Sequence, residues 1–197
     1  MASARTAIDL PAPDVLEAEL PIRTERFKRD ALHLLYGMSD SCVASHDIHQ
    51  TRSQQRSYLE SLTTTGLAVL GVFVRILGSG YFRLAQKNNR SNKMNDSIRE
   101  RWIVFEDRVL RYGPFFAYAA TLIAQTERVI RNWSDEVITQ ALKDMEAFET
   151  GRVEGYAGLQ SVLWKLFCVR VKCDPFDSWN AAKERVEEAM ADYKIEG

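Results

Sequence analysis

The chain is poor in the residues that build disulfides, metal sites and many active sites. Its 197 residues include three cysteines, three histidines and five prolines. The cysteines, Cys42, Cys168 and Cys173, are odd in number and lack C-x-x-C spacing, so we expect free thiols in a reducing compartment. Cys168 falls in an apolar stretch typical of a core, and Cys173, beside Lys172, is the more reactive candidate.

Motifs of common enzyme classes are missing as well. The sequence contains no G-x-S-x-G nucleophile elbow, no H-E-x-x-H zinc motif and no glycine-rich phosphate loop. Residues 1–20 carry acids and no apolar stretch, so neither a secretory signal nor a transit peptide is predicted. We therefore favour a protein without catalytic residues or a cofactor, located in the cytoplasm or elsewhere inside the cell.

An excess of one charge sign is absent from the chain as a whole. The 26 basic and 27 acidic residues leave a net charge of −1, which disfavours a general nucleic-acid binder. The length favours one domain, and a hydrophobic share of 46% is enough to build a core without disulfide bonds or a structural metal ion.

Long apolar runs are also scarce, and the one that stands out covers residues 66–84. A membrane span needs about 18 uninterrupted apolar residues, and Arg75 and Arg83 interrupt this run. A buried β-hairpin turning at residues 78–80 is a second interpretation, because the run is rich in valine and isoleucine. The third is a buried helix, and we favour it because the valines and isoleucines do not alternate strictly with polar residues.

Apolar residues recur at helical steps from upstream into this run, and the periodicity predicts one central helix over about 53–77. The stripe consists of Tyr58, Leu59, Leu62, Gly66, Val69, Leu70, Phe73 and Leu77. Gly66 and Gly71 are expected to let neighbouring backbones approach closely. The helix is expected to end near residues 78–80 or to continue as a bent turn to Gln86.

The rest of the chain predicts an all-α, single-domain bundle of six or seven helices, with a proline-containing N-terminal arm. The arm covers residues 1–22 and the helical domain residues 23–197. A helix should end at Gly37 and be followed by a loop over 38–51, and Gly113-Pro114 should break a later helix. Further helices are expected from Ser97, from Ser134, around Leu159 to Phe167, and after Asp174-Pro175.

Histidines cluster weakly in the predicted loop. His46 and His49 would share one face of a helix and, with Asp47, could bind a metal ion, but no third ligand stands at an expected spacing. Neighbouring carboxylates such as Glu106 and Asp107 point apart on a helix and are expected to be solvated. We therefore predict no metal site, with the two histidines as weak candidates.

Charge is distributed unevenly along the chain. Residues 83–133 carry ten basic and five acidic side chains, and residues 134–197 carry eight basic and thirteen acidic ones. Opposite faces of this kind favour association between copies or with a partner protein. The basic cluster that could instead contact RNA or an anionic surface comprises Arg83, Lys87, Arg90, Lys93, Arg99 and Arg101.

Aromatic residues gather around the predicted helix break. They are Tyr112, Phe115, Phe116 and Tyr118, with Trp102 one helix segment earlier. A break beside aromatic side chains can frame an apolar pocket for a small molecule. Three functions follow from the sequence: a non-enzymatic interaction protein that self-associates or docks a partner, which we favour; a carrier of an apolar ligand; and a binder of RNA or an anionic surface.

Overall fold

The computed structural model describes residues 25–40, 48–88, 96–126 and 158–191, and every element in them is a helix. The helices are α2 (Glu25–Asp40), α3 (Ile48–Ser61), α4 (Thr64–Asn88), α5 (Asp96–Thr126), α7 (Leu159–Val171) and α8 (Ser178–Ala191). The predicted all-α class is confirmed for this part of the chain. The predicted arm over residues 1–22 and the predicted helix from Ser134 lie outside the described residues.

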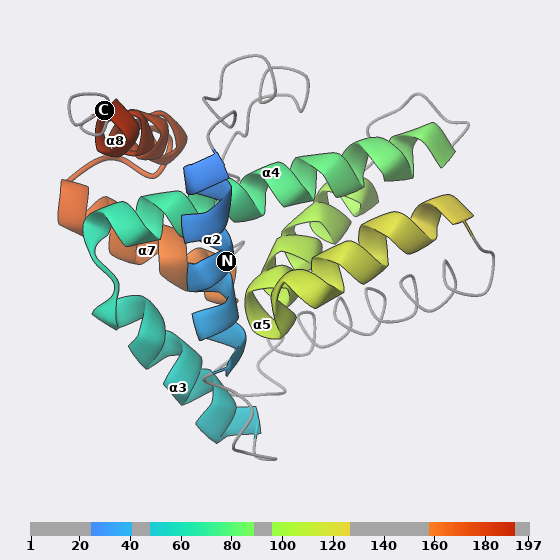
Figure 1. The fold of residues 1–197 in the computed structure, drawn as a ribbon, viewed down its shortest axis with the longest axis horizontal. Coiled ribbons are helices and arrows are strands. Elements are labelled where there is room, and N and C mark those ends of the chain that lie inside the picture. Colours follow the sequence, from blue (N-terminus) through green and yellow to red (C-terminus); the bar gives the residue numbers. More distant parts are fainter. Residues whose placement is uncertain (1–24, 41–47, 89–95, 127–157, 192–197) are drawn as a thin grey trace, which may run out of the picture.

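Helix α4 is the axis of the bundle (Figure 1). It packs against α2, α5, α7 and α8, and each residue from Leu67 to Arg75 is buried. Such burial on all sides explains why this part of the sequence is almost entirely apolar. The core combines side chains from every packed helix: Phe27, Leu35, Leu70, Phe105, Leu163 and Trp179. The interpretation of the run as a covered helix is confirmed, and the hairpin interpretation is wrong.

The segment Thr64–Tyr81 of α4 has the length and composition of a helix that could cross a membrane. Within this segment, 61% is buried inside the protein. Helices at the centre of a globular core share this composition, so the apolar character is weak evidence for a membrane span.

The prediction of one helix over 53–77 is wrong in its boundaries, because the chain breaks between α3 and α4. Thr63 caps the new helix: its Oγ1 accepts a hydrogen bond of 3.0 Å from the Gly66 amide, and its carbonyl accepts one of 2.9 Å from Leu67. Gly66 therefore lies in the first turn of α4, near its own cap and not against a neighbouring backbone.

The carbonyls that end α3 are bound by an arginine from another helix. The Arg170 guanidinium of α7 donates hydrogen bonds to the carbonyl of Glu60, at 2.7 Å, and to that of Leu62. The positive group compensates the unpaired carbonyls at the helix C-terminus. The break in the helix is thus stabilised by long-range contacts that the hydrophobic stripe does not reveal.

Glycines expected to end helices, at Gly37 and over residues 78–80, lie inside helices, and α4 follows the stated alternative in which the helix continues past residue 80. Helix α2 continues past Gly37, where a Cβ would lie 2.9 Å from the Tyr58 ring of α3, so this glycine makes room for a neighbour. Helix α4 likewise continues through Gly78 and Gly80. The predicted loop over 38–51 is too long on both sides, because α2 ends at Asp40 and α3 begins at Ile48.

Candidate functional site at the α5 kink and the charges behind it

The predicted break in α5 is confirmed at Gly113, whose backbone has φ 77° and ψ −169°. A side chain there would be strained, and its Cβ would lie 2.8 Å from Ser39 Oγ and 3.9 Å from the Leu35 carbonyl. The end of α2 therefore packs directly on the kink. Pro114 begins the second half of α5, where its missing amide costs nothing.

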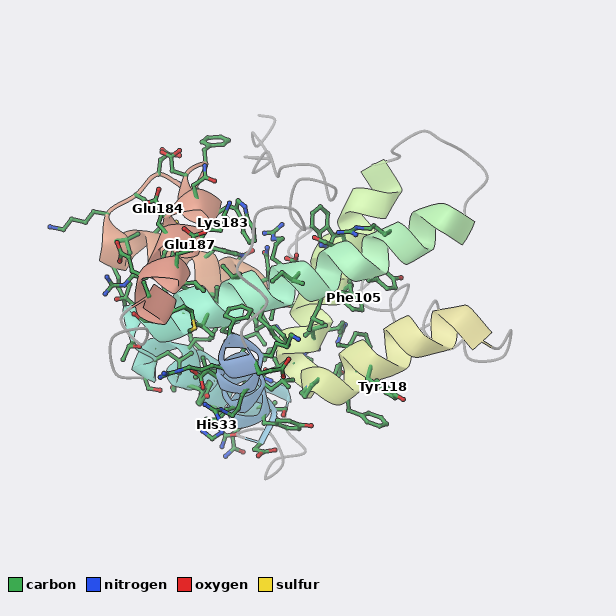
Figure 2. All side chains as sticks on the ribbon, turned by 45° about the horizontal axis from the view of Figure 1, so that its top comes forward. His33, Phe105, Tyr118, Lys183, Glu184 and Glu187 are labelled. Atoms are coloured by element: carbon green, nitrogen blue, oxygen red, sulfur yellow. The ribbon has the colours of Figure 1, made fainter. Side chains whose placement is uncertain are left out.

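The five aromatic residues predicted to line a pocket lie in two different environments. Trp102 and Phe116 are buried in the core, and Trp102 packs on α4. Tyr112, Phe115 and Tyr118 are exposed by 50%, 76% and 61%. We refer to these three exposed residues as the kink surface. Figure 2 shows Tyr118 projecting away from the bundle, whereas Phe105, on the same helix, lies inside it.

Tyr112 is held between two arginines of its own helix. The Arg108 Nη1 donates a hydrogen bond of 3.3 Å to the Tyr112 hydroxyl. The guanidinium carbons of Arg108 and Arg111 lie 5.8 Å and 5.9 Å from the centroid of the tyrosine ring. Both distances are within the range of a cation–π interaction. The Arg111 carbonyl, in turn, accepts a hydrogen bond of 3.2 Å from Gln55 of α3.

A chain of aromatic rings connects this surface to α4. The ring of Tyr112 lies 6.0 Å from that of Phe116, and Phe116 lies 5.8 Å from Phe105. Phe105 stacks on Tyr81 of α4 with a centroid distance of 4.3 Å and an interplanar angle of 5°. These spacings are typical of favourable aromatic pairs, so the position of Tyr112 is fixed from the core outward.

Behind the kink, an ion pair is buried where α4, α5 and α7 meet. Arg75 Nε lies 3.2 Å from Glu106 Oε1, and their side chains are only 3% and 1% exposed. The Arg75 guanidinium carbon lies 5.2 Å from the Trp102 ring and 5.7 Å from the Trp164 ring. Gln160 of α7 donates a hydrogen bond of 3.1 Å to the other carboxylate oxygen. Arg75, the one charged residue between Gly66 and Leu77, is thus a link between three helices.

Burial raises the pKa of Glu106 from 4.5 to about 7. The charge of Arg75 and side-chain hydrogen bonds from Gln160 and Trp102 lower the pKa, but loss of hydration outweighs them. Both side chains are buried, so the pair links the helices that surround it.

Asp107, the residue after Glu106 on α5, binds the N-terminus of α7. Asp107 Oδ1 accepts a hydrogen bond of 2.6 Å from the Leu159 amide, at the first residue of that helix. A carboxylate at a helix N-terminus satisfies an unpaired amide and complements the helix dipole. The prediction that Glu106 and Asp107 are solvated is therefore wrong. The side chains of Glu106 and Asp107 do point in different directions from α5, but α4 and α7 cover both of those sides of the helix.

Two glycines of α4 make this junction possible. A Cβ at Gly71 would lie 2.9 Å from Leu163 and 3.2 Å from Trp164, both on α7. A Cβ at Gly78 would lie 2.7 Å from Trp102 Cδ1. The close neighbours of Gly71 are side chains of α7 and not a backbone, so the expected approach of backbones is not found there. Gly78, near which the helix was expected to end, likewise makes room for side chains. One turn of α4 separates each glycine from Arg75, so the indole rings on both sides reach the guanidinium.

The basic cluster proposed for RNA or an anionic surface is described only in part. Arg83 is half-buried on α4. Lys87, Arg99 and Arg101 lie on α4 and α5 without described side chains, and Arg90 and Lys93 lie outside the described residues. Two further basic residues of the 83–133 region, Arg108 and Arg111, are buried and so reduce its exposed positive charge.

The weak metal candidates do not gain support. His49 lies within α3 without a described side chain, and His46 lies outside the described residues. Within residues 25–40, 48–88, 96–126 and 158–191, no group of three or more His, Cys, Asp or Glu side chains could hold a metal ion.

Another exposed aromatic residue lies in the connection between α7 and α8. Phe176 is 58% exposed and is flanked by the exposed carboxylates Asp174 and Asp177. Asp174 Oδ1 accepts a hydrogen bond of 2.9 Å from the Phe176 amide, which shapes the turn. We refer to Asp174, Phe176 and Asp177 as the loop surface. Over residues 158–191 five basic residues balance five acidic ones, so the net acidic excess of the C-terminal region lies outside the described part, and the loop surface is acidic only locally.

No protein-family model, curated protein or solved structure matches the chain.

Proposed function

We propose that the chain is a non-enzymatic interaction protein that self-associates head to tail. In this arrangement the kink surface of one copy binds the loop surface of the next copy. The observation that carries the proposal is the exposure of Tyr112, Phe115 and Tyr118 around a rigid kink. Exposed aromatic groups of this kind mark interaction sites more often than isolated surface residues do.

The kink surface has the composition of an interaction hot spot. Tyrosine and arginine are enriched among the residues that dominate binding energy, and here arginines lie directly against a half-exposed tyrosine ring. The backbone beneath is fixed by the Gly113 contact with α2 and by the Gln55 hydrogen bond from α3. A rigid surface loses little conformational entropy on binding.

Charge complementarity favours the loop surface as the occupant. The loop surface presents Phe176 between two carboxylates, and the Phe176 ring would pack among Tyr112, Phe115 and Tyr118. Arg108 and Arg111 lie beneath this surface with their side chains buried, so their positive charge would act on the carboxylates from below and not through direct contact. Such complementarity adds to the rate and specificity of association.

The two surfaces lie far apart in one molecule. In Figure 1 the connection between α7 and α8 is on the left, and the second half of α5 extends to the right. A contact between them must therefore join different copies. Because the two surfaces differ, the contact is heterologous and would build chains or a closed ring.

The other functions proposed from the sequence have less support. The predicted ligand pocket would need Trp102 and Phe116 to line it, and both side chains are occupied by packing inside the protein. Contact with RNA or an anionic surface depends on residues 83–101, whose side chains are largely undescribed.

Sedimentation velocity over a wide range of protein concentration tests the proposal. We expect the sedimentation coefficient of the wild type to rise with concentration and to fall again in high salt. Phe115→Ser and Phe176→Ser should each prevent the increase, because each removes one half of the contact. Val169→Ser is the matched control, since this apolar residue is 68% exposed but belongs to neither surface. A wild type that stays monomeric at high concentration and low salt would contradict the proposal.

A further inference from the structure

Two cysteines meet at the C-terminal end of α7. Cys168 and Cys173 are five residues apart, and on a continuous helix their side chains would diverge by about 140°. The chain leaves the helix at Lys172, whose backbone is left-handed with φ 58° and ψ 40°. This residue reverses the chain and returns Cys173 to the last turn of the helix.

The turn is a Schellman motif. The Cys173 amide donates a hydrogen bond of 3.2 Å to the Cys168 carbonyl, and the Lys172 amide donates to the same carbonyl. In this motif the two residues joined by the outer hydrogen bond also pack their side chains together. Here those residues are the two cysteines, and the Cys173 thiol is among the groups that raise the pKa of Cys168. Both are free thiols in the structure.

We propose that Cys168 and Cys173 form a redox pair, in which a hydroperoxide oxidises Cys173 and Cys168 then closes an intrachain disulfide across the α7 C-terminus. The left-handed turn at Lys172 returns the backbone of Cys173 to the last turn of α7, so closure requires little movement of the backbone. The inference is independent of the proposed self-association, although the pair lies at the base of the loop surface.

The first step takes place at the more exposed sulfur. Cys168 is buried and Cys173 is half-buried. The Cys173 thiolate attacks one oxygen of the hydroperoxide, so an S–O bond forms and the O–O bond breaks. The departing oxygen takes a proton and leaves as water or an alcohol. Cys173 is now a sulfenic acid, oxidised by two electrons.

The second step closes the disulfide. The Cys168 sulfur attacks the Cys173 sulfur, so the S–S bond forms and the S–O bond breaks. The departing hydroxide takes the proton of Cys168 and leaves as water. In total, two thiols lose two protons and two electrons, and hydrogen peroxide is reduced to two waters.

The environment of Cys168 supports this order of steps. Burial raises the pKa of Cys168 to about 12, and the hydrogen bond to Cys173 and the charges of Cys173 and Asp174 raise it further. Cys168 therefore stays protonated, and the more exposed Cys173 is the sulfur that meets the hydroperoxide first.

Peptide mapping of the full-length protein after treatment with hydrogen peroxide tests the pair. Trypsin cleaves after Arg170 and Lys172, so the two cysteines fall on different peptides, which only a disulfide can hold together. We expect to detect the linked peptides in protein that migrates as a monomer in the absence of reductant. Reduction should separate the two peptides. Cys42→Ser, the matched control, should give the same linkage.

Two further variants separate the steps. In Cys168→Ser, oxidation should stop at the sulfenic acid of Cys173, which a dimedone probe traps. In Cys173→Ser, the probe should leave Cys168 unlabelled. The proposal is overturned if both thiols of oxidised wild type remain free to alkylation. It is equally overturned if Cys173 is found linked to Cys42 or to another copy.

Discussion

Replacing Gly78 of α4 by alanine tests the junction of α4 and α5 at a single methyl group. The added Cβ would lie 2.7 Å from Trp102 Cδ1 and 2.8 Å from Glu106 Oε1. Both groups are buried, and Glu106 is held by Arg75, so neither can move away freely. Gly80 is the matched control on the same helix, because a Cβ there would meet nothing within 4 Å.

The two substitutions should change stability in opposite directions. Replacing glycine by alanine inside a helix stabilises it by about 1 kcal/mol, and both variants receive this gain. Overpacking a buried site costs about 1–3 kcal/mol, and ordinary carbon contacts lie near ~3.5–4.0 Å, so we expect the upper end of that range for Gly78→Ala. The net expectation is a loss of about 2 kcal/mol for Gly78→Ala and a gain of up to about 1 kcal/mol for Gly80→Ala.

Urea unfolding measures the difference directly. Tryptophan fluorescence and circular dichroism should give coincident transitions, which establishes that one free energy of unfolding describes the protein. The free energy of unfolding should fall with urea concentration at the same slope in wild type, Gly78→Ala and Gly80→Ala, whereas the midpoints of the three transitions should differ. If Gly78→Ala and Gly80→Ala are equally stable within about 0.5 kcal/mol, α5 does not pack on α4 as described.

Three further predictions concern the buried charges and the end of α3. Burial raises the pKa of Glu106 in the folded protein to about 7, so the contribution of the protonated carboxyl group to stability is complete below the unfolded pKa and is lost as the pH rises to 7. The free energy of unfolding of wild type, relative to that of Glu106→Gln, should therefore fall by about 3 kcal/mol between pH 4.5 and pH 7. A constant difference between the two proteins would contradict the shift. Arg75→Met leaves that carboxyl group without its cation and should cost about 3–5 kcal/mol at pH 8 in urea unfolding, and less at pH 5, where the group is neutral. Arg170→Ala removes the hydrogen bonds to the carbonyls of Glu60 and Leu62 and should cost about 1 kcal/mol, with faster amide exchange in the last turn of α3 as the confirming measurement.

Local signals in the sequence were sufficient for several features. The break at Gly113-Pro114 is confirmed, because a proline and a flexible residue determine the backbone whatever packs around them. The covered character of the α4 run is confirmed as well, since an apolar surface on all sides of a helix has to be buried.

Long-range packing explains the errors. Gly37 and Gly78 look like helix ends from the sequence, but each provides space for an aromatic side chain from another helix. Glu106 looks solvated because nothing nearby in the sequence is its partner, and Arg75 lies 31 positions away. Thr63 was a visible signal for the start of α4, but the apolar stripe continued across it and concealed the break.

The candidate site was predictable only in its composition. The aromatic cluster around Gly113 was evident, but a stretch of sequence cannot tell which rings turn inward at a kink. Phe116 and Tyr112 are four residues apart, yet one is buried and the other half-exposed. The meeting of Cys168 and Cys173 depends on one left-handed residue, Lys172, whose side chain gives no indication of that conformation.

A mixing experiment tests the head-to-tail contact most directly. Phe115→Ser retains only its loop surface and Phe176→Ser only its kink surface, so each should sediment as a monomer alone. Mixed in equal amounts, they should form a one-to-one complex that grows no further, because the remaining surfaces are the defective ones. If the wild type self-associates but the two variants stay monomeric when mixed, this result would contradict the head-to-tail contact.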